Sequence, residues 1–174
     1  MIDSRHFRRL EQLYATAPTA ARQTREVAVA LGRAELNAHI DGARLRPQDV
    51  ARHAHYHDML ADAASLAAGS LVKDRVVMAE QFDMQVLKPG YSGDATASAC
   101  VTLAQPPHYR VDVHLVSETG EVLARGVGIF ARSAVELPPD PVPDEAPPSP
   151  SKLRPEPAVY ATVWSTPFGL VHLN

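Results

Sequence analysis

The feature that most constrains the fold is the stretch from residue 56 to residue 69, YHDMLADAASLAAG. As a helix it carries apolar side chains on nearly every side, so it has to be buried, and its alanines permit close approach of a sheet. The exceptions are Asp58, Asp62 and Ser65, which share one stripe because they are spaced four and three residues apart. This stripe either faces water or lines a cleft. In a cleft, apolar neighbours raise the pKa of Asp62, which suits a general base.

Hydrophobic patterning on both sides of this helix predicts an α+β fold. Before it we expect a short helix and a hairpin turning at Gly32-Arg33, and after it four alternating strands. The predicted ranges are 4–15 for the first helix, 24–31 and 34–41 for the hairpin strands, and 75–87, 94–104, 109–117 and 121–135 for the later strands. Antiparallel strands around one central helix explain this order.

The C-terminal part of the chain has a different composition. Ten of the fifteen prolines lie from residue 138 onward. We therefore expect residues 1–136 to form the folded domain and residues 137–157 to form an extended linker. The last segment, 158–174, contains Trp164 and Phe168. It is predicted to dock on a sheet of its own or a partner subunit, or to act as a plug or peptide ligand.

Composition excludes several classes of function. The 174 residues carry a formal net charge of −3 with no basic surplus, which argues against binding to nucleic acid or to a membrane surface. No apolar run is long enough to cross a bilayer, and the charged N-terminus is unlike a signal peptide. Cys100 is the only cysteine, so an internal disulfide is excluded. These features predict a cytoplasmic protein.

Three histidines, His53, His55 and His57, alternate at the start of the central stretch and could be taken for a metal site. On a helix their side chains spread over about 200°, which is too wide to converge on one ion. We therefore predict no metal and no other cofactor.

The chain resembles hotdog-fold acyl-CoA thioesterases of the phenylacetate-pathway type, relatives of 4-hydroxybenzoyl-CoA thioesterase. That family carries HGGxxxxLxD, and here the matching stretch runs from His53 to Asp62. The family's LRPG-x-x-GD loop is matched by LKPGYSGD, residues 87–94. The last strand is similar to the family pattern from Gly120 to Phe130. The resemblance covers about residues 5 to 134.

This resemblance implies a hotdog fold, in which a curved antiparallel sheet wraps around the central helix. It also implies a homodimer or tetramer with each active site at a dimer interface, acting on an acyl-CoA thioester. Asp62 is then the base or nucleophile, beside His53 and His55, and the His55 amide at the helix start polarises the thioester carbonyl. The expected substrate contacts are Ala54, Ser65, Lys88 and Gly90.

Two departures from the family pattern leave an alternative open. Ala54 and His55 replace the Gly-Gly pair, and neither permits close backbone approach as freely as glycine. In some relatives the motif is HGSxxxxxLDDAA, and on that alignment Ala61 stands at the reacting aspartate. The second hypothesis is a non-catalytic hotdog protein that binds an acyl-CoA or a protein partner.

Overall fold

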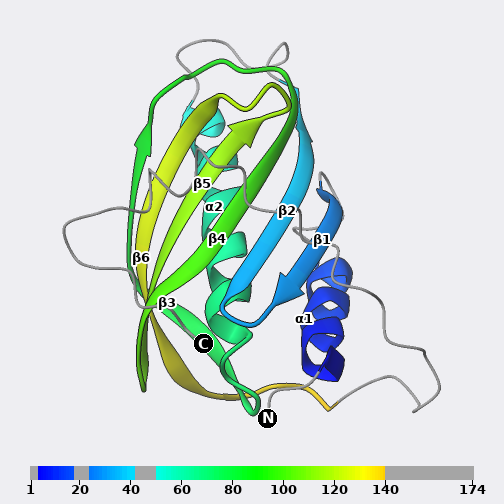
Figure 1. Ribbon diagram of the computed structural model, residues 1–174, viewed down its shortest axis with the longest axis vertical. Helices are drawn as coiled ribbons and strands as arrows, with labels where there is room; N and C mark the ends of the chain where they lie inside the picture. The colour runs from blue at the N-terminus through cyan, green and yellow to red at the C-terminus, as the bar shows by residue number, and fades with distance from the viewer. Residues whose placement is uncertain (1–3, 18–23, 42–49, 140–174) are drawn as a thin grey trace.

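The computed structural model describes residues 4–17, 24–41 and 50–139, and this part of the chain forms one six-stranded antiparallel sheet and two helices (Figure 1). The elements are α1 (Ser4–Thr16), β1 (Thr24–Ala30), β2 (Arg33–Ile40), α2 (Val50–Gly69), β3 (Arg75–Val86), β4 (Gly93–Gln105), β5 (His108–Ser117) and β6 (Val122–Glu136). The strands lie in the order β1-β2-β4-β5-β6-β3, so β1 and β3 are the two edges.

The order of elements predicted from the sequence is confirmed, and every strand agrees with its predicted range to within one residue at each end. One boundary is wrong, because α2 begins at Val50 and not at residue 56. The prediction followed the apolar run, whereas the helix continues beyond the buried part into polar sequence. Neither helix in the described part of the chain is long and apolar enough to span a bilayer. The predicted linker and docking segment lie almost wholly outside the described residues.

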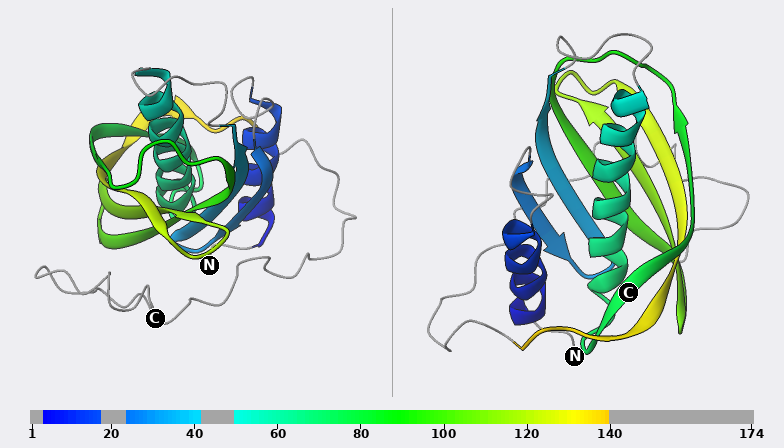
Figure 2. Two further views of the ribbon diagram at one scale, coloured as in Figure 1. Left: turned by 90° about the horizontal axis from the view of Figure 1, so that it is seen from above. Right: turned by 180° about the vertical axis from the view of Figure 1, so that it is seen from behind.

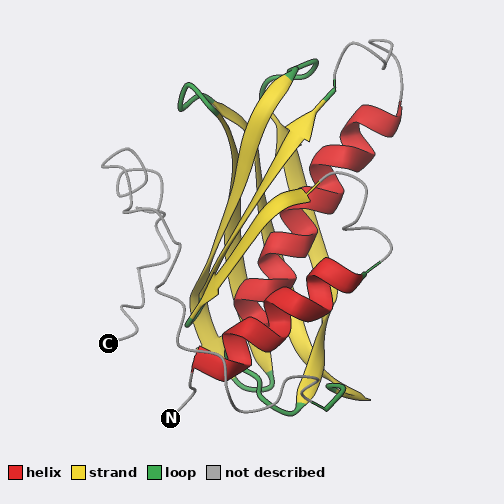
Figure 3. Cartoon of the chain, turned by 90° about the vertical axis from the view of Figure 1, so that its right-hand side faces the viewer, coloured by secondary structure: helices red, strands yellow, loops and turns green. Residues whose placement is uncertain are grey.

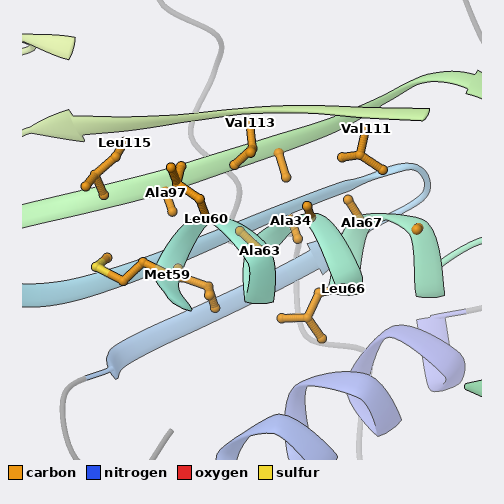
Figure 4. Packing of buried hydrophobic residues seen from close by; sticks show 14 of the residues in the cluster. Ala34, Met59, Leu60, Ala63, Leu66, Ala67, Ala97, Val111, Val113 and Leu115 are labelled. Atoms are coloured by element: carbon orange, nitrogen blue, oxygen red, sulfur yellow. The ribbon is translucent and has the colours of Figure 1, made fainter. Parts of the chain in front are cut away.

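Helix α2 lies in the hollow of the curved sheet (Figures 2 and 3). Five of its side chains, those of Leu60, Ala63, Ala64, Ala67 and Ala68, have no exposed surface. The sheet opposes them with fully or almost fully buried side chains, among them Ala34, Leu36, Ala97, Val111, Val113 and Leu115. Figure 4 shows Leu60, Ala63 and Ala67 of α2 meeting buried side chains of strands β2, β4 and β5. The small alanines let the helix lie close against the strands.

Two glycines of β6 make room for aromatic side chains. A Cβ atom on Gly128 would lie 2.5 Å from Phe130 Cε2 and 2.8 Å from Phe82 Cδ2, and one on Gly126 would lie 2.9 Å from Phe82 Cζ. The rings of Phe82 and Phe130 fill this space edge to face, with 6.4 Å between their centroids. The Gly-x-Gly pattern of the last strand is thus a packing requirement.

Strand β5 is buried on both faces, although strict alternation in the sequence predicts one apolar and one polar face. Asp112 and His114 are each only 5% exposed. The Arg110 Nε atom lies 3.5 Å from Asp112 Oδ1. Burial, together with the charge of Arg125, lowers the pKa of His114 to about 4, so its imidazole is neutral at pH 7. Both buried polar side chains thus have an arginine beside them, Arg110 near Asp112 and Arg125 opposite His114 in the strand register.

Side-chain hydrogen bonds fix helix α1 to α2, to β1 and to the chain after β6. His6 Nε2 donates a buried hydrogen bond to the backbone oxygen of Gly69 at the end of α2, at 2.9 Å. The Glu11 carboxylate accepts a hydrogen bond from the backbone N–H of Val29 in edge strand β1, also at 2.9 Å. Arg9 donates to the backbone oxygen of Leu137 after β6. These bonds hold α1 beside α2 and β1.

Replacing Gly128 with valine should lower the free energy of unfolding by about 1–3 kcal/mol, because the added carbons meet the rings of Phe82 and Phe130. Urea denaturation followed by circular dichroism measures this change. The matched control is Gly69→Ala, where the new Cβ would have its nearest contacts at 3.7 Å and the helix favours alanine. An unchanged urea midpoint for Gly128→Val would show that the glycine is not required by packing.

Candidate active site

The Asp62 carboxylate lies on α2 where that helix faces α1. It is half-buried, and the Tyr14 hydroxyl donates a hydrogen bond to its Oδ2 atom at 3.1 Å. The two residues are 48 positions apart in the sequence, and only the packing of α1 on α2 brings them together. A carboxylate held by a single hydroxyl donor keeps acceptor capacity for water or substrate.

The pKa of Asp62 is raised above its ordinary value of 3.8. The largest cause is burial, which disfavours the charged carboxylate. The Tyr14 hydrogen bond opposes this shift, the charge of Asp58 adds to it, and the charge of His57 lowers it slightly. The Asp62 carboxylate is therefore a stronger base than an exposed aspartate, and it keeps the Tyr14 hydroxyl as a hydrogen-bond donor.

Asp62 and Tyr14 both line a cavity of about 320 Å³. Its walls come from α1, α2, the start of β3 and the chain after β6, and they are mostly aliphatic. The lining residues are Leu10, Leu13, Tyr14, Asp62, Ser65, Leu66, Gly69, Arg75, Val76, Val77, Leu137 and Pro138. The cavity thus combines one carboxylate with a largely apolar interior, which is the usual character of a small-ligand site.

The polar stripe predicted on the central helix divides into two parts. Asp62 and Ser65 line the cavity. Asp58, one turn earlier, has a side chain 73% exposed, with its Oδ1 atom 3.5 Å from His57 Nδ1. The Ser65 hydroxyl donates to the backbone oxygen of Ala61 at 2.8 Å, so it turns toward its own helix. The stripe therefore faces water at one end and a cleft at the other.

The residues aligned with HGG lie inside α2, because the helix begins at Val50. Free backbone N–H groups belong to the first turn of a helix, here residues 50 to 53, so the His55 amide lies beyond them. The helix-start argument for a donor at His55 is therefore wrong. Ala54 is exposed, while the side chain of His53 lies outside the described residues.

The His55 imidazole is half-buried. Its Nε2 atom is buried without a hydrogen-bond partner among the described residues. Burial lowers the pKa of His55, although the nearby Asp58 charge opposes this. His57 instead stacks edge-on against Phe82, with 5.3 Å between ring centroids. No group of three His, Cys, Asp or Glu side chains in the described ranges is arranged to hold a metal ion.

Lys88 and Gly90 belong to a loop that packs near the first half of α2 and does not line the Asp62 cavity. The Tyr56 hydroxyl donates to the Lys88 backbone oxygen at 3.2 Å. The Lys88 ammonium group pairs with Glu121. Gly90 has a φ of 81°, a turn conformation that glycine adopts without strain. Any contact of Lys88 with a phosphate has to compete with Glu121.

Sequence reasoning missed Tyr14 as a site residue. Its position in the stripe of Phe7, Leu10 and Tyr14 made it a core residue of the first helix. Its hydroxyl was the available signal, since a tyrosine in an aliphatic stripe usually needs a hydrogen-bond partner when buried.

An NMR titration of the Asp62 carboxyl should give a pKa above 3.8, and Tyr14→Phe should raise it further, because the variant removes the donor that stabilises the carboxylate. Tyr109→Phe is the matched control, since Tyr109 lies outside the Asp62 cavity. A pKa that stays at 3.8, or that falls in Tyr14→Phe, would contradict this account of the site.

No protein-family model and no curated protein matches the sequence. Solved structures do match. The E. coli PaaI protein from the phenylacetic acid degradation operon superposes with a TM-score of 0.68 at 16% identity, over 78% of this chain and 99% of that chain. A thioesterase from Haemophilus influenzae gives 0.61 at 16% identity, over 70% and 86%. A protein from Streptococcus mutans bound to acetyl CoA gives 0.56 at 14% identity, over 63% and 88%.

At these identities the likeness is one of fold. It extends over most of each solved chain and over the part of this chain that forms the sheet and helices. A six-stranded antiparallel sheet wrapped around α2 is the architecture that the sequence resemblance implied. The chain therefore has the hotdog fold, shared with PaaI and with structures of thioesterases.

Proposed function

We propose that this protein hydrolyses an acyl-CoA thioester and that Asp62 is the reacting carboxylate. The observation that carries the proposal is the Asp62 side chain, half-buried in an apolar cavity, hydrogen-bonded by Tyr14 and raised in pKa. Perturbed carboxylates in clefts are typical of catalytic sites. The fold, which also occurs in thioesterases and in a protein bound to acetyl CoA, agrees with this chemistry.

The proposed reaction needs one base and one attacking water. Asp62 takes a proton from the water as the water oxygen bonds to the thioester carbonyl carbon. The tetrahedral intermediate then collapses, the carbon–sulfur bond breaks, and the CoA sulfur leaves with the proton from Asp62. In the second form of the mechanism the carboxylate oxygen attacks the carbonyl carbon, the carbon–sulfur bond breaks and CoA leaves as its thiolate. Water then hydrolyses the resulting anhydride to the free acid and the Asp62 carboxylate, and the proton released from the water goes to the CoA sulfur. Both forms require an ionised Asp62, so activity falls as pH drops through its pKa.

We further propose that two copies of the chain join through β3. Among the described residues, each edge strand has one side without a strand partner, but Glu11 of α1 already accepts a hydrogen bond from the Val29 N–H of β1. Strand β3 has twelve residues and, within the described part of the chain, pairs with β6 alone. Four consecutive residues, 78 to 81, are exposed, with Met78 at 58%. A long edge strand exposed on both faces is typically covered by a partner.

The alternative is a hotdog protein that binds an acyl-CoA without cleaving it. The observation in its favour is that Ala54 and His55 stand at the family's Gly-Gly pair, with the His55 amide inside α2. A thioesterase needs a donor for the oxygen that gains negative charge in the reaction. A chain without that donor would keep the binding cavity and lose the rate enhancement.

The substitution Asp62→Asn should lower kcat/KM for acyl-CoA hydrolysis by on the order of a hundredfold or more, because it removes the base and keeps the shape of the side chain. Asp58→Asn, on the same helix with an exposed side chain, should change the rate little. The assay is thiol release over a panel of short, medium, long and aryl acyl-CoAs, with melting temperatures to show that each variant is folded.

Two results would redirect this proposal. If Asp62→Asn is as fast as the unmodified protein, another residue carries the reaction. If no acyl-CoA is hydrolysed but one of them raises the melting temperature, the non-catalytic binding function replaces the hydrolase.

The proposed dimer is tested with Ala79→Lys, which places a charge in the middle of the exposed part of β3 and should shift the protein from dimer to monomer. Sedimentation or light scattering measures the mass. The matched control is Ala134→Lys, at an exposed alanine near the end of β6, which should remain dimeric. An unmodified protein with the mass of one chain would exclude the β3 interface.

A further inference from the structure

We propose that the cavity between α1 and α2 holds the acyl group of the substrate, and that this group is apolar and of medium length or aromatic. The inference rests on the proposed function, since it takes Asp62 as the point where the thioester carbonyl lies. It adds the location of the acyl group and names Leu13 and Ser65 as residues that limit its size.

The chemistry of the walls favours an apolar group. Six aliphatic side chains line the cavity, namely Leu10, Leu13, Leu66, Val76, Val77 and Leu137. The two other polar side chains beside Asp62 and Tyr14 are already engaged. Ser65 donates to the Ala61 backbone oxygen. Arg75 donates to the Ala134 backbone oxygen at 2.6 Å and lies 3.4 Å from Glu136. A polar acyl chain would find few partners there, whereas an apolar chain gains from leaving water.

The position of Asp62 fits a thioester whose acyl chain enters this space. The carboxylate and the Tyr14 hydroxyl meet at one place on the wall, at 3.1 Å, and the aliphatic residues form the remainder. A thioester substrate has a matching arrangement of polar and apolar groups, with one polar reacting group at the end of an apolar chain. Binding the chain in the cavity would hold the carbonyl carbon near the carboxylate.

The size of the cavity sets the limit on the acyl group. A volume of about 320 Å³ lies at the small end of the range for ligand pockets. The wall formed by α1 is fixed by the hydrogen bonds of His6, Arg9 and Glu11, so it cannot retreat freely from a longer chain. Leu13 on α1 and Ser65 on α2 both line this space, and neither is fully buried. Their volumes therefore set how much of the chain the cavity accepts.

The test uses two CoA thioethers that cannot be hydrolysed, octyl-CoA and ethyl-CoA, with calorimetry to measure the ratio of their dissociation constants. In the unmodified protein octyl-CoA should bind at least about tenfold more tightly, the effect of burying roughly two methylenes. Ser65→Leu fills the cavity and should remove most of this difference. Leu13→Ala enlarges the cavity and should move the preference to decyl-CoA. Leu103→Ala removes an exposed leucine elsewhere and should leave the ratio unchanged.

The outcomes separate this inference from the proposed function. If octyl-CoA shows the expected ratio but octanoyl-CoA is not hydrolysed, the cavity holds the acyl group and the hydrolase proposal fails. Suppose instead that octanoyl-CoA is hydrolysed, that Ser65→Leu leaves the ratio of the octyl-CoA and ethyl-CoA dissociation constants unchanged, and that Leu13→Ala leaves the octyl-CoA and decyl-CoA ratio unchanged. The acyl group then lies elsewhere. Should Ser65→Leu fail to fold, Leu13→Ala decides alone, and an unchanged preference between octyl-CoA and decyl-CoA overturns the inference.

Discussion

The burial of α2 inside one curved sheet is the constraint on which the rest of the molecule depends. Ala63, Ala64, Ala67 and Ala68 leave no surface exposed, and larger residues at these positions would push the helix away from the strands. The sheet that surrounds the helix contains strands from both sides of it in sequence. Strand β1, which precedes the helix, forms one edge of this sheet, and β3, which follows the helix, forms the other. The sheet does not enclose the whole helix. The side bearing Asp62 and Ser65 is left to α1, and the cavity forms along this seam.

The seam explains why a carboxylate can lie so close to a hydrophobic core. The aliphatic residues around the Asp62 side chain exclude water from it, and this desolvation raises its pKa. The Tyr14 hydroxyl donates one hydrogen bond to the carboxylate. Without Tyr14 the pKa of Asp62 would rise further, because this hydrogen bond stabilises the charged carboxylate. The position of α1 therefore affects chemistry as well as packing, and the hydrogen bonds of His6, Glu11 and Arg9 to α2, β1 and the chain after β6 help to fix that position.

The sequence was sufficient for what depends on local periodicity. Alternation placed every strand, and the spacing of Asp58, Asp62 and Ser65 placed three polar groups on one stripe. It was insufficient where the outcome depends on residues distant in the chain. Tyr14 meets Asp62 across 48 positions, and His114 is buried beside the charge of Arg125, which lies opposite it on the neighbouring strand β6. The start of α2 was misplaced because apolar periodicity marks the buried part of a helix and not its end.

The remaining requirement of the proposed reaction is a donor for the thioester oxygen. The His55 amide lies beyond the first turn of α2, and Tyr14 already donates to Asp62. The N–H groups of the first turn of α2 belong to residues 50 to 53, about three turns before Asp62 along the helix, which is too far to reach a thioester held at that carboxylate. The proposed hydrolase therefore needs a donor from another part of the molecule, and in the proposed dimer we favour the second copy that pairs along β3 as its source. Whether the protein cleaves a thioester or only binds it thus depends on whether association of two chains completes the site, since the carboxylate and the apolar cavity belong to each chain alone.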